Sequence, residues 1–394
     1  MDAIGALLTY PVRVLWNAIK SPVAPQWSRT RVVHHEDGPP DWLVELRAAC
    51  SSLEGFFPSP WAPDGHSQTV LGVLVHDADS RVKYEREVLD TPDNDKLALD
   101  WASMRGLDAP KEDAPVCMLF HGLSGDSSDM ESAAGVALQH GMRAVAVSKR
   151  GQAPGLDLVQ PKLLSFGDTG DLRHVCTVLK ERYPNCELVG LGSSAGGGQL
   201  ASYLQDYPTG NHLDGVAVLS PGYDSKKLFS ANDTGTVPWP YGWILLRGMK
   251  RIVEKNRAVL KGHIDVEKIK RCATFNEFYA EVDFKLYDYK DTDELWDACN
   301  PLRGDFLGCS VPTLCISSVD DPVVPEEMIP ISKMQTLWKS SALLITEHGG
   351  HCGFLEGWSG RRWDYHVACT FLTLVSQRAR AVSDRTEDTP STTS

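Results

Sequence analysis

A serine in a glycine-rich turn is the residue of this sequence best placed to carry out covalent chemistry. An apolar run at residues 188–191 leads into the pattern G-x-S-x-G at residues 192–196, and a helix-forming segment follows. In a strand–turn–helix of this kind the tight turn presents Ser194, and the glycines allow a close approach of strand and helix that a Cβ would block. The same pentapeptide also occurs in turns without chemistry, so Ser194 needs a base and an acid elsewhere in the chain to act as a nucleophile.

Candidate partners follow the serine along the chain. An apolar strand is expected at residues 311–318, and the turn after it holds Asp320 and Asp321; a second strand at 342–346 precedes His351, which glycines flank. An imidazole that takes the serine proton, held by a carboxylate, makes the hydroxyl a nucleophile. Alone, each partner could be an ordinary turn or loop residue. The chain order serine, aspartate, histidine, each at the end of an expected strand, predicts a triad of Ser194, His351 and either Asp321 or Asp320.

Acyl transfer also needs hydrogen-bond donors that stabilise the negative charge developing on the carbonyl oxygen. A further apolar strand at residues 115–120 ends in the segment 121–126, which begins His-Gly-Leu-Ser-Gly. Main-chain N–H groups stabilise the oxyanion of acyl transfer, and one of them belongs to the residue after the nucleophile. We therefore expect Ala195 and Leu123 to form the oxyanion hole, and His121 to brace the loop rather than carry protons. Cys352 is disfavoured as a nucleophile because Ser194 occupies the turn.

The elements that must position these residues alternate between strand and helix. An opening antiparallel pair is expected, and then strands and helices follow one another through the centre of the chain. This alternation predicts an α/β fold with a mostly parallel sheet, helices on both faces, and an active site beyond the carboxyl ends of the strands. The expected strands are 82–89, 97–101, 115–120, 144–147, 188–191 and 215–219, and the expected helices lie near 127–140 and 170–183.

Four parts are expected along the chain. Residues 1–55 form a lead-in with two helical patches joined by a polar stretch at 29–40; residues 56–220 and 300–378 form the core; residues 221–299 form a helical cap insertion; and residues 379–394 form a disordered polar tail. The insertion is rich in aromatic residues. These either border an apolar substrate pocket or form a small core of the insertion itself.

Composition limits the class of protein. The chain has 394 residues and a net charge of −13, and no dense Lys/Arg run appears, which argues against nucleic acid as a partner. The ten cysteines lack C-x-x-C pairs and metal-ligand spacing, which favours reduced thiols, no metal and a cytosol-facing compartment.

The first twenty residues carry apolar side chains near a helical period. Pro11, Arg13 and Asn17 interrupt them, so they fall short of the roughly 18 uninterrupted apolar residues of a spanning helix, and Asp2 is untypical of a signal peptide. Two interpretations remain. The segment is either an interfacial helix that makes peripheral membrane contact or a helix packed on the protein itself. The localisation is accordingly cytoplasmic or peripherally membrane-associated.

The motifs together resemble the YheT-like branch (AB hydrolase type 4) of the α/β-hydrolases, which includes membrane-associated lipid esterases and medium-chain fatty-acid ethyl ester synthases. The resemblance implies the α/β-hydrolase fold, with Ser194 as nucleophile, His351 as base and Asp321 as acid, since Pro325 completes the D-x-x-x-P turn of the family. The segment before the acid, residues 283–296, matches only loosely. The matching stretches are 61–69, 121–125, 149–151, 167–173, 192–196, 320–322 and 348–354.

Three functions compete at this point. The first is a serine esterase or lipase that cleaves a small-molecule acyl ester, lipid-like and with a short to medium acyl chain, through an acyl-Ser194 intermediate and without a cofactor. The second is an acyltransferase that uses the same triad to pass the acyl group to an alcohol. The third is a catalytically silent α/β-hydrolase that binds a lipid or a partner, which an intact triad disfavours.

Overall fold

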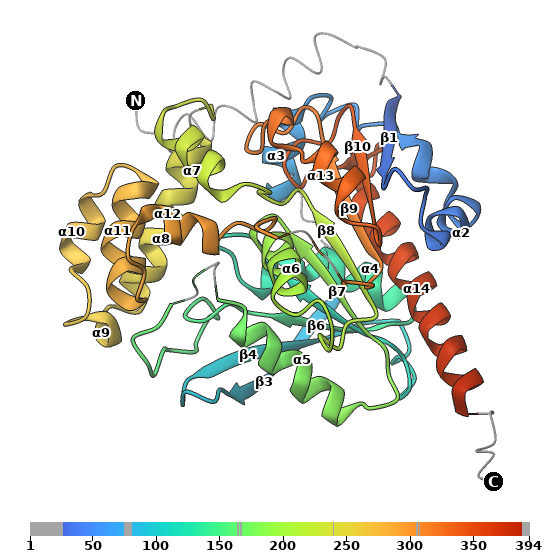
Figure 1. Ribbon diagram of the computed structural model, residues 1–394, viewed down its shortest axis with the longest axis horizontal. Helices are drawn as coiled ribbons and strands as arrows, with labels where there is room; N and C mark the ends of the chain where they lie inside the picture. Colours follow the sequence, from blue (N-terminus) through green and yellow to red (C-terminus); the bar gives the residue numbers. More distant parts are fainter. Residues whose placement is uncertain are drawn as a thin grey trace.

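A large central sheet dominates the computed structural model (Figure 1). The structure describes residues 27–74, 81–163, 165, 168–238, 240–304, 306 and 308–387. The interfacial helix considered for the first twenty residues lies outside the described residues.

Ten strands form this sheet in the order β2-β1-β10-β9-β8-β7-β5-β6-β4-β3. The six strands from β10 to β6 run parallel, whereas β3 and β4 at one edge and β1 and β2 at the other join antiparallel. This confirms the mostly parallel sheet with an antiparallel opening pair. The strands are β1 (Ser28–His34), β2 (Gly55–Phe56), β3 (Val82–Asp90), β4 (Lys96–Met104), β5 (Val116–Phe120), β6 (Arg143–Val147), β7 (Leu188–Ser193), β8 (Gly215–Leu219), β9 (Thr313–Ser318) and β10 (Ser341–Thr346). A separate pair is β11 (Leu355–Glu356) and β12 (Arg361–Arg362).

Helices cover both faces of the sheet because the parallel strands are apolar on both sides, which also explains their continuous apolar sequence. One face packs against α2, α4 and α14, and the other against α5, α6 and α13. The helices are α2 (Asp41–Ala49), α3 (Gly65–Leu74), α4 (Glu131–Gln139), α5 (Gly170–Arg182), α6 (Ala195–Asp206), α7 (Ser225–Asp233), α8 (Tyr241–Lys255), α9 (Arg257–Leu260), α10 (Val266–Arg271), α11 (Phe275–Leu286), α12 (Thr292–Ala298), α13 (Ile331–Thr336) and α14 (Trp363–Glu387). Short 3₁₀ turns are η1 (Ser51–Glu54), η2 (Ser127–Met130) and η3 (Glu326–Met328).

The chain between β8 and β9 forms a separate group of helices, α7 to α12, most of which lie to the left in Figure 1. Aromatic side chains from this stretch pack on one another; Phe229, for example, stacks on Trp296 with ring centroids 5.0 Å apart. Many of the aromatics therefore form a core of the inserted helices. Leu123 belongs to the same cluster, so the inserted helices rest against the loop after β5.

Two expectations about the ends of the chain were wrong. The polar stretch at 29–40 was expected to be a connection, but residues 28–34 form β1, which pairs antiparallel with β10. Most of its side chains are exposed or half-buried, so its sequence does not read as a core strand. The tail was expected to be disordered from residue 379, but α14 continues to Glu387, and Arg380 forms ion pairs there with Glu187 and Asp113.

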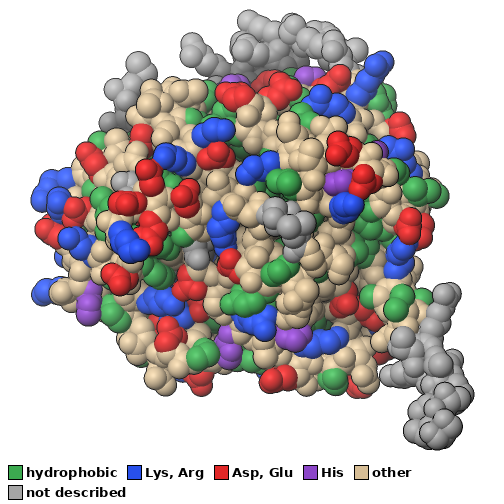
Figure 2. All heavy atoms as spheres, viewed as in Figure 1, with side chains coloured by type: hydrophobic (Ala, Val, Ile, Leu, Met, Phe, Trp, Pro, Cys, Tyr) green, Lys and Arg blue, Asp and Glu red, His purple; other side chains and the backbone are tan. Residues whose placement is uncertain are grey.

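Two observations concern partners. In the described part of the chain, no helix combines the length and the apolar character needed to cross a bilayer. On the face seen in Figure 2, acidic and basic side chains are interspersed, and no continuous basic patch lies on that face.

Candidate active site

The backbone around Ser194 has a strained turn between β7 and α6. Ser194 has φ 52° and ψ −119°, a region that costs a residue with a side chain about 1–3 kcal/mol. Its N–H donates to the carbonyl of Leu219 at 2.7 Å, which ties the turn to the neighbouring strand β8. A Cβ on Gly192 would lie 2.5 Å from the backbone of Gly196, and one on Gly196 would lie 2.2 Å from the Phe120 carbonyl oxygen. Both positions therefore require glycine.

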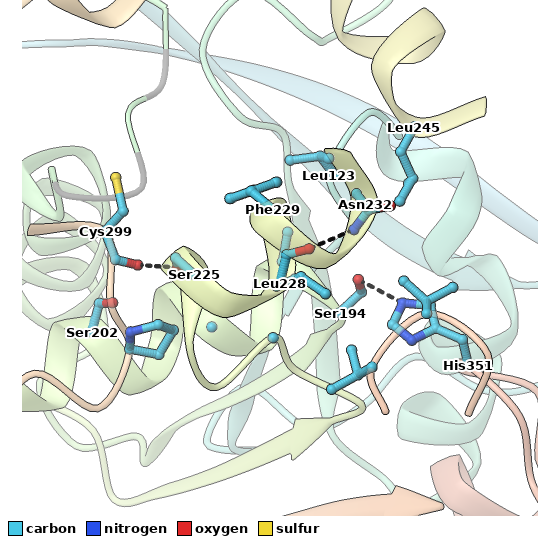
Figure 3. Close-up of a pocket in the computed structure, with 16 residues that line it drawn as sticks. Leu123, Ser194, Ser202, Ser225, Leu228, Phe229, Asn232, Leu245, Cys299 and His351 are labelled. Carbon is cyan, nitrogen blue, oxygen red and sulfur yellow. Dashed lines mark hydrogen bonds between the residues drawn. The ribbon is translucent and has the colours of Figure 1, made fainter. Parts of the chain in front are cut away.

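A chain of hydrogen bonds joins the serine to a histidine and an aspartate. The Oγ of Ser194 lies 2.9 Å from Nε2 of His351, and Nδ1 of His351 lies 2.8 Å from Oδ2 of Asp321 (Figure 3 shows the first contact). Asp321 is buried, and its Oδ1 accepts the N–H groups of Val323 at 2.7 Å and Val324 at 2.8 Å. These two bonds fix the carboxylate so that Oδ2 faces the imidazole.

The second candidate acid has a different partner. Asp320 lies 3.0 Å from Nδ1 of His348, and its Oδ1 accepts the N–H of Gly350 at 2.9 Å. The hydrogen bond that the Asp320 carboxylate accepts raises the pKa of the His348 imidazole above its ordinary value. Asp320 thus anchors the loop that carries His351, whereas the contact with His351 itself is made by Asp321.

Helix α3 holds the same loop from the other side. Thr69 accepts the N–H of His351 at 2.8 Å and donates its hydroxyl to the carbonyl of Gly65 at 2.6 Å. Gln68 bonds both the N–H of Leu355, at 2.6 Å, and its carbonyl, at 3.2 Å. This G-H-S-Q-T run at residues 65–69 belongs to the stretch 61–69 that carries the family resemblance, and its contact with His351 was not expected from the sequence. The available signal was the run of four polar residues at 66–69 directly before the apolar half of this helix.

The loop of residues 121–125 lies beside the serine. A Cβ on Gly122 would come within 3.9 Å of the Ser194 Cβ, and Leu123 lines the same cavity as Ala195 and Ser194. His121 is fully buried, and burial holds its pKa well below the ordinary value, so the ring is neutral. Four of the five residues expected at the site therefore line one cavity, and the fifth, Asp321, contacts His351.

The cavity beside Ser194 has mostly apolar walls. It lies between α6 and α7, with Ser194 and His351 at one end and Ser202 and Cys299 toward the other (Figure 3). An apolar group attached to a carbonyl at Ser194 can therefore extend into the protein.

Two alternative chemistries find little support among the described residues. Burial raises the pKa of the Cys352 thiol to about 12, so a nucleophilic thiolate is disfavoured. The part of the chain that the structure covers holds no group of three or more His, Cys, Asp or Glu side chains arranged to bind a metal ion.

Comparison with known proteins places the chain among hydrolases. A family model, Hydrolase_4 (serine aminopeptidase, S33), matches residues 111–352, a span that contains Ser194, Asp321 and His351.

Curated relatives include Phospholipase ABHD3 of Bos taurus, 28% identical over 315 residues (77% of this chain and 74% of the relative). Protein ABHD15 of Homo sapiens is 29% identical over 339 residues (84% and 70%). The Monoacylglycerol lipase of Saccharomyces cerevisiae is 24% identical over 403 residues (91% and 86%). With the parallel sheet and the serine turn described above, the family match leads to one conclusion: the chain belongs to the Hydrolase_4 family of the α/β-hydrolases.

Proposed function

We propose that this protein is a serine hydrolase that cleaves carboxylic esters of lipid-like molecules, with short- to medium-length acyl chains. The observation that carries the proposal is the hydrogen-bonded chain from Ser194 through His351 to Asp321 at the end of an apolar cavity. The names of the relatives, a phospholipase and a monoacylglycerol lipase, support a lipid ester as the substrate.

In the first half of the reaction the ester acylates the enzyme. His351 Nε2 takes the proton of the Ser194 hydroxyl while Oγ attacks the ester carbonyl, and the carbonyl oxygen becomes an oxyanion beside Leu123 and Ala195. The intermediate collapses, the C–O bond of the ester breaks, and His351 gives the proton to the leaving alcohol. Asp321 stabilises the charged imidazole throughout, because its Oδ2 faces Nδ1.

In the second half water reverses these roles. His351 takes a proton from water, the hydroxide attacks the acyl-Ser194 carbonyl, and Ser194 leaves with the proton as the carboxylic acid forms. An alcohol in place of water would give an acyltransferase by the same steps. The two outcomes therefore differ in which acceptor reaches the acyl group.

The surrounding elements extend this proposal. Residues 221–299 act as a cap, since α7 and α8 supply the walls Leu228, Phe229 and Leu245 of the cavity. The G-H-S-Q-T run and the His351 loop that it holds support, as part of this proposal, membership of the YheT-like branch. We also propose that the first twenty residues make peripheral membrane contact. Deletion of this segment followed by liposome pelleting would test this, and unchanged binding would reject the contact.

An active-site-directed fluorophosphonate probe tests the central claim. Wild-type protein is expected to be labelled, Ser194→Ala is expected not to be, and Ser202→Ala, which changes another serine of the cavity, is expected to retain labelling. Labelling of folded Ser194→Ala would remove Ser194 as the nucleophile, and an unlabelled, folded wild type would favour the silent alternative. Assays of short-, medium- and long-chain esters with and without ethanol then separate hydrolysis from acyl transfer.

A further inference from the structure

A buried lysine lies directly behind the loop that is expected to bind the oxyanion. Lys149 follows β6, the loop of residues 121–125 follows β5, and these two strands are parallel neighbours. The side chain of Lys149 is almost entirely buried, with 4% of the residue exposed. A buried amine is costly unless its hydrogen bonds are satisfied, so its contacts are informative.

The amine of Lys149 binds this loop at three points. Nζ donates to the main-chain carbonyl of His121 and to that of Gly122, the latter at 3.0 Å, and it lies 3.1 Å from Nδ1 of the His121 ring. The main-chain N–H of Lys149 also donates to Nε2 of the same ring, at 3.2 Å. One residue thus contacts both the backbone and the side chain of the loop's first residue.

These contacts define the tautomer of the His121 ring. A main-chain N–H is always a donor, so Nε2 of the neutral His121 ring must accept, and the ring proton lies on Nδ1. That proton faces the carbonyl oxygen of Gly122, 3.0 Å from Nδ1, so the His121 ring and the Lys149 amine converge on the same peptide oxygen. Burial lowers the pKa of Lys149 to about 7, against a smaller opposing effect of Asp129.

The bond to Gly122 determines where the next N–H points. In a trans peptide unit the C=O and the following N–H point in opposite directions. The carbonyl of Gly122 points to Lys149, so the N–H of Leu123, in the same unit, points away from Lys149. Leu123 lies on the cavity that Ser194 also lines.

We propose that Lys149 is a positioning residue for ester hydrolysis, which holds the Gly122–Leu123 peptide so that the N–H of Leu123 faces the oxyanion formed at Ser194. The inference rests on the proposed function of Ser194. It assigns a role to the K-R-G run at residues 149–151, which the triad does not use.

A second lysine provides a matched control. Lys255, at the end of α8, also donates to main-chain carbonyls, those of Gly151, Ala153 and Leu156, and burial lowers its pKa. Its contacts are with the 151–156 loop and not with the peptide that precedes Leu123. Replacing either lysine by methionine removes the amine donors and keeps an unbranched side chain, so both variants leave carbonyls unpaired.

The test compares catalysis and oxyanion binding in the two variants. Lys149→Met is expected to lower kcat by about 10- to 100-fold with KM within about twofold, because a misdirected donor costs less than the roughly 10²–10³-fold effect of losing one. The inhibition constant of a trifluoromethyl ketone, whose serine adduct carries an oxyanion, is expected to rise by the same factor as kcat falls. Lys149→Gln, which keeps two amide donors, is expected to recover part of both effects. In Lys255→Met both quantities are expected to stay near the wild-type values.

The outcomes separate this inference from the function on which it rests. A folded wild type without fluorophosphonate labelling would overturn the proposed function. Labelled wild type together with unchanged ketone affinity in folded Lys149→Met would overturn the role of Lys149 alone. If Lys149→Met does not fold, Lys149→Gln decides: ketone affinity equal to that of the wild type rejects the role, and weakened affinity with retained KM supports it.

Discussion

Replacing Asp321 by asparagine should abolish most of the activity, because it moves the proton of the His351 imidazole from Nδ1 to Nε2. The buried N–H groups of Val323 and Val324 need an acceptor, so the amide oxygen takes the place of Oδ1 and the NH₂ group takes the place of Oδ2. That nitrogen is a donor and would face Nδ1 of His351, across a distance that is now 2.8 Å. The imidazole then carries its proton on Nε2, which faces Ser194 and no longer accepts the serine proton.

The expected size of the effect follows from this change of tautomer. A comparable substitution in a serine triad lowers kcat by about 10⁴-fold, or about 5 kcal/mol in activation free energy. Asp320→Asn is the matched control one residue away. The new amide oxygen can still accept the N–H of Gly350, and His351 keeps its hydrogen bond with Asp321. The kcat of Asp320→Asn is therefore expected to fall by less than about tenfold.

The assay is the hydrolysis of a soluble p-nitrophenyl ester, with thermal melting to establish that both variants fold. The rate of fluorophosphonate labelling provides a second readout, since it also requires an activated serine. Equal losses in the two folded variants, or a larger loss in Asp320→Asn, would refute the reasoning, because only Asp321 touches His351.

Three further predictions follow from other contacts of the site. Thr69→Val removes the acceptor of the His351 N–H and is expected to lower both kcat and, by about 1–3 kcal/mol, the free energy of unfolding, as measured by urea denaturation. Gly198→Val narrows the cavity, where even a Cβ would lie 3.2 Å from a proline ring, and is expected to shift the preference toward shorter acyl chains by about 10- to 100-fold in kcat/KM ratios. Asp320→Asn is expected to lower the free energy of unfolding more at about pH 5.5 than at about pH 9. In the wild type, Asp320 raises the His348 pKa in the folded state. The resulting stabilisation is fully present below the ordinary pKa of 6.5 and is lost as the pH rises through the raised value.

Each of these has a clear contrary result. Thr177→Val is the control for Thr69→Val, because the Thr177 hydroxyl donates to a carbonyl of its own helix α5. If kcat fell equally in the two variants, Thr69 would not position His351. An unchanged chain-length profile in Gly198→Val would place the acyl chain elsewhere. If the stability difference between Asp320→Asn and the wild type did not change with pH, Asp320 would not raise the pKa of His348 in the folded state.

Much of the fold was predictable because it depends on local patterns. Continuous apolar runs identified the central strands, and the turn at 192–196 identified the point where Ser194 had to leave the sheet. Such patterns fail where an element is only partly buried. Strand β1, next to the two-residue edge strand β2, has mostly exposed and half-buried residues, and the last turns of α14 are polar, so both were mistaken for irregular chain.

The sequence by itself determined the candidate nucleophile, the base and the order of the triad, since residue types and strand ends are properties of neighbouring positions in the chain. Only the tertiary structure decided which aspartate meets His351, which helix holds the His351 loop, and what Lys149 contacts. Thr69 and His351, for instance, are 282 positions apart in the chain yet joined by a hydrogen bond. Hydrogen bonds depend on distance and direction within tenths of an ångström, and those arise when the packed sheet brings remote segments together.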